Sequence, residues 1–197
     1  MTELPVVGPG ELPEEFHAVR VLLELIGEDP DRPGLIATPR RVVDALVEMT
    51  SGYSMDPAAL LGVTFPDTCD EMVVVGPIRF VSLCEHHMLP FTGSATVGYV
   101  PDGRVVGLSK IPRVVVAFAK RLQVQERLTE QIADTINEVL MPKGVGVVIR
   151  AHHSCMGVRG VMQPDTVMTT SALRGVMLDK PEARAEFLAF ARNGGAL

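Results

Sequence analysis

Two short segments carry most of the residues that could do chemistry. They are Cys84-Glu85-His86-His87 and His152-His153-Ser154-Cys155, which together hold four of the five histidines and two of the three cysteines. A cysteine and a histidine three positions apart, as Cys84 and His87 are, can contact one ion across a tight turn. Thiolate with imidazole is a ligand set that zinc prefers, and Cys155 would supply a third ligand from the second segment.

The number of protein ligands decides what such an ion could do. A closed structural site needs four, and one of the three neighbouring histidines could complete it, whereas a catalytic site keeps three and leaves a position to water. Spacing alone leaves both arrangements open, and also the absence of a metal, because paired Cys-x-x-Cys knuckles are missing. His86 and His153 favour catalysis, since a neutral imidazole beside a zinc site is a suitable acid or base near pH 7.

A second group of residues has the chemistry of phosphate binding. Ser109, Lys110, Arg113 and Arg159 lie near predicted strand or helix ends, where they could converge on a polyphosphate. Solvated surface charge is the alternative for each of the cations. Neither GxxxxGK[ST] nor GxGxxG occurs, so side chains would have to bind the phosphates.

Gln125 and Glu126 open a predicted helix. An acidic residue in the first turn of a helix interacts favourably with the helix dipole, which is a purely structural reason for Glu126. A carboxylate can also accept two hydrogen bonds at once, and the Watson–Crick edge of guanine presents two adjacent donors. The residues alone leave both interpretations open.

Composition bounds the class of protein. The chain has 197 residues, of which 47% are apolar, so it can bury a core and is not mainly disordered. A net charge of −6 argues against a surface for nucleic acid or anionic lipid. No apolar run approaches the roughly 20 residues of a membrane span, and the first residues lack the pattern of a secretory signal. With an odd number of cysteines, a cytoplasmic location is the expectation.

Hydrophobic periodicity predicts the elements that position these residues. Helical spacing is found over residues 12–29, 38–52, 111–121, 128–140 and 181–192. Short β-prone runs are found over residues 72–75, 78–83, 94–100, 104–108, 145–151 and 167–173. Pro101-Asp102-Gly103 predicts a hairpin turn between two of these runs, and residues 53–70 look like a connector. Because the strands cluster rather than alternating with helices, we expect an α+β fold with an antiparallel sheet.

Several long motifs, in order, resemble the signature blocks of the GTP cyclohydrolase I family. They are SLCEHHMLPFTG, YVPDGRVVGLSKIPRVV, RLQVQERLTEQIAD, AHHSCMGVRGV and TTSALRG, with DRPGLIATPRRV upstream. The resemblance implies zinc-dependent hydrolytic opening of the guanine imidazole ring of GTP, giving 7,8-dihydroneopterin triphosphate and formate. A paralogue acting on GTP in a specialised pterin or deazapurine pathway, and a non-catalytic zinc-stabilised assembly, are the alternatives.

The resemblance also implies a role for each matching residue. Zinc would be bound by Cys84, His87 and Cys155, while His86 and His153 would transfer protons.

Substrate recognition follows from the same resemblance. Glu126, helped by Gln125, would recognise guanine. The triphosphate would be bound by Lys110, Arg113, Arg159 and Arg41, with Ser109 nearby. Asp44 departs from the family pattern, because many relatives place a basic residue there and a carboxylate would repel phosphate.

The fold of this family is the tunnelling fold, or T-fold, an antiparallel sheet with two helices packed on one side. We therefore expect residues 1–70 to form an N-terminal helical segment with a connector, and residues 71–197 to form a T-fold catalytic domain. The resemblance further implies a homodecamer of two pentamers, in which open sheet edges are paired between subunits. In that assembly Arg41 would act in the pocket of a neighbouring subunit.

Overall fold

The computed structural model describes residues 13–193, and the chain divides between Met49 and Thr50 into two compact units. The first unit contains α1 (Glu14–Leu25) and α2 (Thr38–Met49), which pack against each other. Both confirm the predicted helices, and α2 begins at the Thr38-Pro39 pair because proline suits the first turn. A catalytic-domain boundary at residue 70 stays a prediction.

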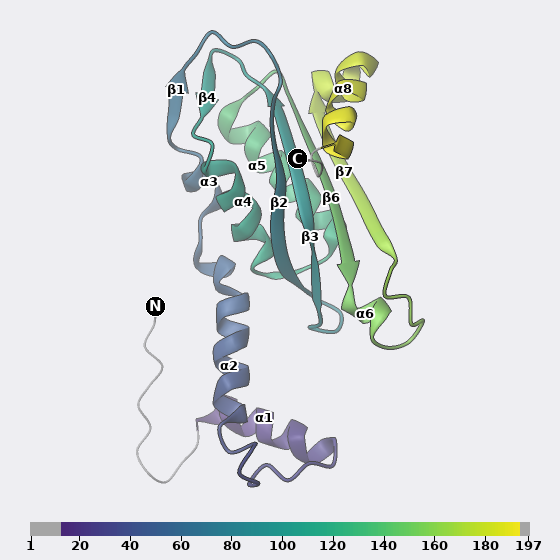
Figure 1. The fold of residues 1–197 in the computed structure, drawn as a ribbon. Helices are drawn as coiled ribbons and strands as arrows, with labels where there is room; N and C mark the ends of the chain where they lie inside the picture. Colours follow the sequence, from purple (N-terminus) through teal and green to yellow (C-terminus); the bar gives the residue numbers. More distant parts are fainter. Residues whose placement is uncertain (1–12, 194–197) are drawn as a thin grey trace. The chain divides into compact units, whose positions relative to one another are not determined.

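The main sheet of the second unit has the strand order β5-β2-β3-β6-β7 (Figure 1). Its strands are β2 (Val73–Cys84), β3 (Pro90–Val100), β5 (Leu122–Gln123), β6 (Gly144–His153) and β7 (Val167–Gly175). Every neighbouring pair is antiparallel except β2 and β5, which run parallel for two residues. The predicted α+β class with an antiparallel-rich sheet is confirmed. The two runs predicted at 72–75 and 78–83 form the single strand β2, with a register shift between them.

Two helices, α4 (Lys110–Ala119) and α5 (Gln125–Leu140), cover one face of this sheet (Figure 1). The pair of helices on one side confirms the arrangement predicted for the fold. Strand β2 alternates as such a half-covered sheet requires, with Ile78 and Phe80 buried and Arg79 and Val81 exposed. Each large apolar side chain buried in this layer stabilises the fold by about 1.5–3 kcal/mol.

The opposite face of the sheet is covered over only part of its length. Helix α8 (Pro181–Asn193), which follows α7 (Val176–Asp179), packs there through the fully buried Phe187. A Cβ at Gly98 or Gly146 would lie within 2.8 Å of the Phe187 ring, so both glycines allow the ring to approach the backbone. Further along β6, Arg150 and His152 are exposed on this face.

The connector contains more structure than the sequence predicts. It forms a 3-10 turn (η1, Ser51–Ser54), α3 (Pro57–Leu60) and the short strand β1 (Thr64–Pro66). Strand β4 (Arg104–Val106) pairs with β1, so the predicted hairpin between β3 and β4 is wrong. The reason is tertiary: both edges of β3 are already paired along its length, with β2 and β6, and no edge is left for β4.

Candidate metal centre and active site

A tight turn joins β2 to β3 and holds two of the predicted ligands together. Cys84 ends β2 and is buried, and its carbonyl oxygen accepts hydrogen bonds from the backbone N–H of His87, at 3.4 Å, and of Met88, at 2.8 Å. The Cys84 N–H in turn donates to the carbonyl oxygen of Leu89 at 2.9 Å. The chain therefore folds back over Cys84 and places the His87 side chain beside its sulfur.

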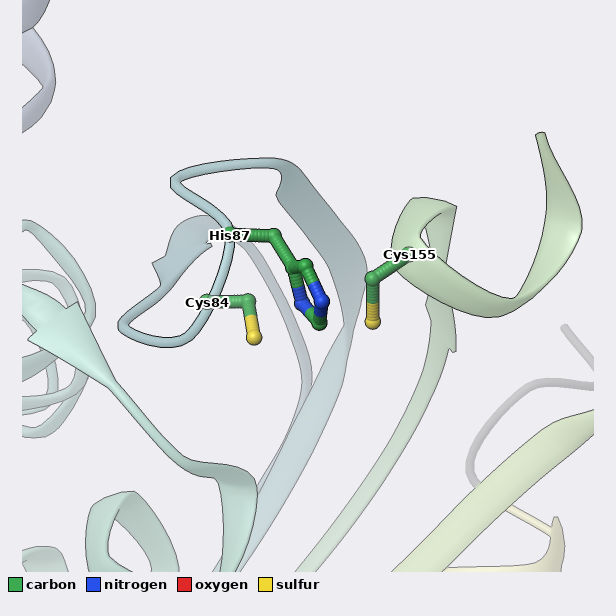
Figure 2. A group of neighbouring side chains, drawn as sticks. All are labelled: Cys84, His87 and Cys155. Carbon is green, nitrogen blue, oxygen red and sulfur yellow. The ribbon is translucent and has the colours of Figure 1, made fainter. Parts of the chain in front are cut away.

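The third ligand comes from the adjacent strand end. Cys155 lies in α6 (Ser154–Gly157), the single turn that follows β6. Because β6 pairs with β3 up to the Phe91–His153 partners, this turn lies next to the β2–β3 turn. The ligand atoms of Cys84, His87 and Cys155 all lie within 4.8 Å of one another, and Figure 2 shows the three side chains converging. The structure thus assembles a group that could bind a metal ion.

The chemistry of this donor set fits zinc. Burial raises the pKa of the Cys155 thiol, and the neighbouring Cys84 sulfur raises it further, since two thiolates so close would repel each other. A divalent cation between them would remove that cost, and two thiolates with one imidazole are typical zinc ligands. His87 is exposed, so the side of the group that it occupies is open to solvent.

His86 lies in the same turn, with one ring nitrogen near the Cys84 sulfur. Its Nδ1 lies 3.9 Å from the Cys84 sulfur, and its Nε2 lies 3.9 Å from a carboxylate oxygen of Glu85. Glu85 also accepts from the Arg127 guanidinium at 2.5 Å. His86 is therefore beside the ligands while its ring remains exposed to solvent.

His153 is held much more rigidly. Its ring stacks on Phe91 with 4.6 Å between ring centroids and an interplanar angle of 6°. Its Nε2 lies 2.8 Å from the side-chain oxygen of Gln125. Burial lowers the pKa of His153, and the Glu126 carboxylate only partly offsets this effect. A neutral imidazole in a fixed orientation is the result.

Gln125 determines which nitrogen of His153 carries the proton. The Gln125 side chain is buried, and its NH2 group donates to the carbonyl oxygens of Ile149 and Met168 and to the Thr170 hydroxyl, at 3.1–3.2 Å. With the amide nitrogen used for donation, the amide oxygen accepts, so His153 donates from Nε2 and keeps Nδ1 as the basic nitrogen.

Two further predicted residues lie near the cluster in the same chain. The Arg159 guanidinium lies 3.3 Å from Nε2 of His87. Glu126 is exposed in the first turn of α5, three residues after Gln123, whose partner in the parallel β2–β5 pair is Cys84. Both side chains are thus placed at the end of the sheet that carries the cysteines.

Three other predicted phosphate ligands of the second unit are not brought to this cluster within one chain. Ser109, Lys110 and Arg113 lie at the start of α4, whereas the end of α4 leads into β5 beside Cys84. A helix of 10 residues is about 15 Å long. Arg41 lies in α2 of the first unit.

Sequence reasoning missed the residues that position His153. Phe91 and Thr170 are neither charged nor part of a ligand pattern, so no local signal identifies them. The available signal was indirect: the two strands were predicted over residues 94–100 and 145–151, and only their extension to residues 90 and 153 in the observed register places Phe91 opposite His153.

Comparison with known proteins identifies the family. A model of the GTP cyclohydrolase I family matches residues 16–192, which is most of the chain. The chain belongs to the GTP cyclohydrolase I family. Curated family members are about half identical to it. GTP cyclohydrolase 1 of Chlorobium phaeovibrioides is 53% identical over 93% of this chain and 85% of its own.

Two further relatives agree with that placement in the GTP cyclohydrolase I family. GTP cyclohydrolase 1 of Chlorobaculum tepidum is 56% identical over 87% of this chain and 77% of its own. The enzyme of Wolinella succinogenes is 51% identical over 90% of this chain and 95% of its own. Among solved structures, apo archaeosine synthase QueF-Like matches 53% of this chain and 92% of its own with a TM-score of 0.43 and 16% identity. None of the helices within residues 13–193 has the length and apolar character that crossing a membrane would require.

Proposed function

We propose that this chain is a GTP cyclohydrolase I, which hydrolyses the guanine imidazole ring of GTP to give 7,8-dihydroneopterin triphosphate and formate. The observation that carries the proposal is the convergence of Cys84, His87 and Cys155 beside the oriented imidazole of His153. Curated relatives named GTP cyclohydrolase 1, half identical over most of the chain, support the same reaction.

The three ligands would hold one zinc ion. When bound, zinc supplies Lewis-acid activation of water near neutral pH. Cys84 and Cys155 contribute two negative charges from adjacent strand ends, and His87 contributes a neutral nitrogen from the turn. With three protein ligands the set matches a catalytic site rather than a closed structural one.

His86 and His153 would move the protons of the reaction. His153 keeps a basic Nδ1 because Nε2 donates to Gln125, and its lowered pKa keeps the ring neutral and able to accept a proton. His86 is exposed beside Cys84, where it can exchange protons with solvent. The two imidazoles thus have different environments, one fixed and one accessible, which suits different proton-transfer steps.

Guanine would be recognised by Glu126. Its carboxylate is exposed at the start of α5, close enough to raise the pKa of His153, and it can accept from two adjacent donors of the purine edge. Gln125 is committed to His153 and to β6 and β7, so we assign its help to positioning the imidazole.

The triphosphate would be bound by residues of more than one subunit. Arg159 is the cation already beside His87, whereas Ser109, Lys110 and Arg113 lie at the far end of α4. A neighbouring copy could bring that end of α4, and Arg41 of its first unit, to this cluster. Asp44 forms an ion pair with Arg40 at 3.5 Å, which offsets the repulsion that its carboxylate would exert on phosphate.

The sheet edges support such an assembly. Strand β5 covers only Leu83 and Cys84, and within residues 13–193 the remaining outer edge of β2 and the outer edge of β7 pair with no strand. Open edges of this length pair readily with another chain. Pairing of β2 with β7 of a neighbouring copy would close a ring of five subunits and leave neither edge unpaired. Two such pentamers would form the homodecamer.

Product analysis tests the reaction. The purified protein is incubated with GTP, formate is measured, and the nucleotide product is oxidised and identified by mass spectrometry as a fluorescent pterin triphosphate. We expect one formate per pterin. Formate with a different product would indicate the paralogue, while bound zinc without GTP consumption would indicate a non-catalytic assembly.

A further inference from the structure

A groove that carries several arginine side chains lies on the sheet face opposite α4 and α5, between β2, β3, β6 and the last turns of α8. Its cavity has a volume of about 590 Å³. Arg79, Arg150 and Arg192 line it, together with His152, and the described lining residues include no aspartate or glutamate. A second hollow of about 470 Å³ continues from it along α8 and shares Arg150 and Arg192. We call the first cavity the arginine groove.

Sheet register places two of these arginines at a fixed spacing. Arg79 on β2 is the partner of Ser94 on β3, and Ser94 is the partner of Arg150 on β6. Two strand spacings separate the arginine backbones by about 10 Å. Between them β3 lines the cavity with the hydroxyl side chains of Thr92, Ser94 and Thr96. The groove is therefore a row of hydroxyls flanked by two guanidinium groups on a rigid support.

The charges of this row are not neutralised by the protein. Within residues 13–193, neither Arg79 nor Arg150 forms an ion pair. By contrast, Arg174 on the edge strand β7 pairs with both Glu130 and Asp134 of α5. Unpaired guanidinium groups in a concave wall concentrate positive potential, although the whole chain carries a net charge of −6. Such a cavity attracts anions.

We propose that the arginine groove is a second anion site that binds a polyphosphate. Two forked donors carried by backbones about 10 Å apart suit an anion that extends over several phosphates rather than a single one, and the hydroxyls between them can donate to its inner oxygens. The groove is separate from the proposed substrate site, because neighbouring side chains of β6 alternate: His152 lines the groove while His153 faces α5.

Arginine-specific labelling read out by peptide mass spectrometry tests the proposal at single residues. The full-length protein is treated with phenylglyoxal, with and without inorganic tripolyphosphate. We expect Arg79 and Arg150 to react in its absence and to be protected in its presence, while Arg104 on β4, outside the groove, is labelled equally in both. Orthophosphate and citrate serve as a single phosphate and a polycarboxylate, and we expect weaker protection by each.

A matched pair of variants measures the contribution of one guanidinium. In Arg150→Ala, the tripolyphosphate concentration that half-protects Arg79 should rise about tenfold. In the control Arg104→Ala, the half-protecting tripolyphosphate concentration should change less than about twofold. Turnover of GTP is followed in both variants and should stay near the wild-type value, so this result is independent of the proposed function.

The proposal is overturned by any of three results. Arg79 and Arg150 could stay unreactive without anion, which would show that the groove is covered. They could react at the same rate with and without tripolyphosphate up to millimolar concentration. Equal protection by citrate or orthophosphate would show a general anion surface and contradict a polyphosphate site.

Discussion

The two faces of the sheet differ in what their side chains do, and neighbouring residues of β6 show the difference most clearly. His153 faces α5, where it stacks on Phe91 and bonds to Gln125, and burial lowers its pKa. His152, one residue earlier, lines the exposed groove on the other face. Identical side chains thus have different environments because the side-chain period of a strand is two residues.

The face under α4 and α5 is also the more completely packed of the two. It buries Ile78, Phe80 and Ile149, and it ends at the cysteine and histidine ligands. The opposite face is packed where Phe187 of α8 lies, and beyond that it is an open groove in which Arg79, Arg150 and His152 stand among apolar side chains. The Cys84, His87 and Cys155 cluster therefore lies at the end of the more completely packed layer, where the surrounding side chains restrict its geometry.

The largest contrast is expected between the two histidines. His153→Ala should lower kcat about 10²- to 10⁴-fold, because a positioned proton-transfer group is lost. His152→Ala should change kcat by less than about threefold, because its ring faces away from the ligands. Formate release at saturating GTP gives kcat, and the zinc content of both variants is measured as a control. Equal losses in the two variants would contradict the division between the faces.

Stability should show the next largest contrast. Ile149→Ala removes a fully buried side chain from the helix-covered layer and should lower the free energy of unfolding by about 2–5 kcal/mol. Ser94→Ala, on the partner strand but in the groove, should change it by less than about 0.5 kcal/mol. Urea denaturation followed by circular dichroism measures both. A costly Ser94→Ala would mean that the groove is part of the packed core.

Much of this organisation follows from local sequence patterns. The helices α1, α2, α4, α5 and α8 and the strands β2, β3, β6 and β7 were predictable, since periodicity and proline-bearing first turns act over a few residues, whereas the two-residue strand β5 was not predicted. The partner of β4 was not, because it depends on both edges of β3 being occupied by β2 and β6. Pairing of that kind is decided by the whole sheet.

The candidate site also has one part that the sequence predicts and one part that it does not. The convergence of Cys84, His87 and Cys155 could be predicted from residue types at strand ends. The burial of Gln125 and its contacts with β6, β7 and His153 could not, because its partners are backbone groups and a threonine far away in the sequence. The roles of the individual site residues stay predictions until they are measured.

A smaller loss of stability is expected from a substitution at a glycine on the face that α8 covers. In Gly146→Ala, the new Cβ would lie 2.6 Å from the Phe187 ring, and the overpacking should cost about 1–3 kcal/mol of unfolding free energy. Adding Phe187→Leu should give less than the sum of the two single losses, since the residues are in contact. Strict additivity in thermal denaturation would rule out the contact as the cause.

The smallest expected effect concerns the support of His153. Thr170→Val removes one acceptor of the Gln125 amide but leaves the carbonyl oxygens of Ile149 and Met168, so stability should fall by about 1 kcal/mol. We expect kcat to fall less than in His153→Ala, with zinc content unchanged. Thr169→Val, at the neighbouring position of β7 that lines the second hollow along α8, is the matched control and should leave kcat at the wild-type value.

X-ray absorption at the zinc edge of the purified protein can show whether two thiolates and one imidazole hold a zinc ion with one position left to solvent. We expect two sulfur neighbours at about 2.3 Å and two nitrogen or oxygen neighbours at about 2.0–2.1 Å. Cys84→Ser, but not Cys69→Ser, should remove one sulfur neighbour. Four protein ligands without solvent, or a sulfur count unchanged in Cys84→Ser, would contradict this zinc site.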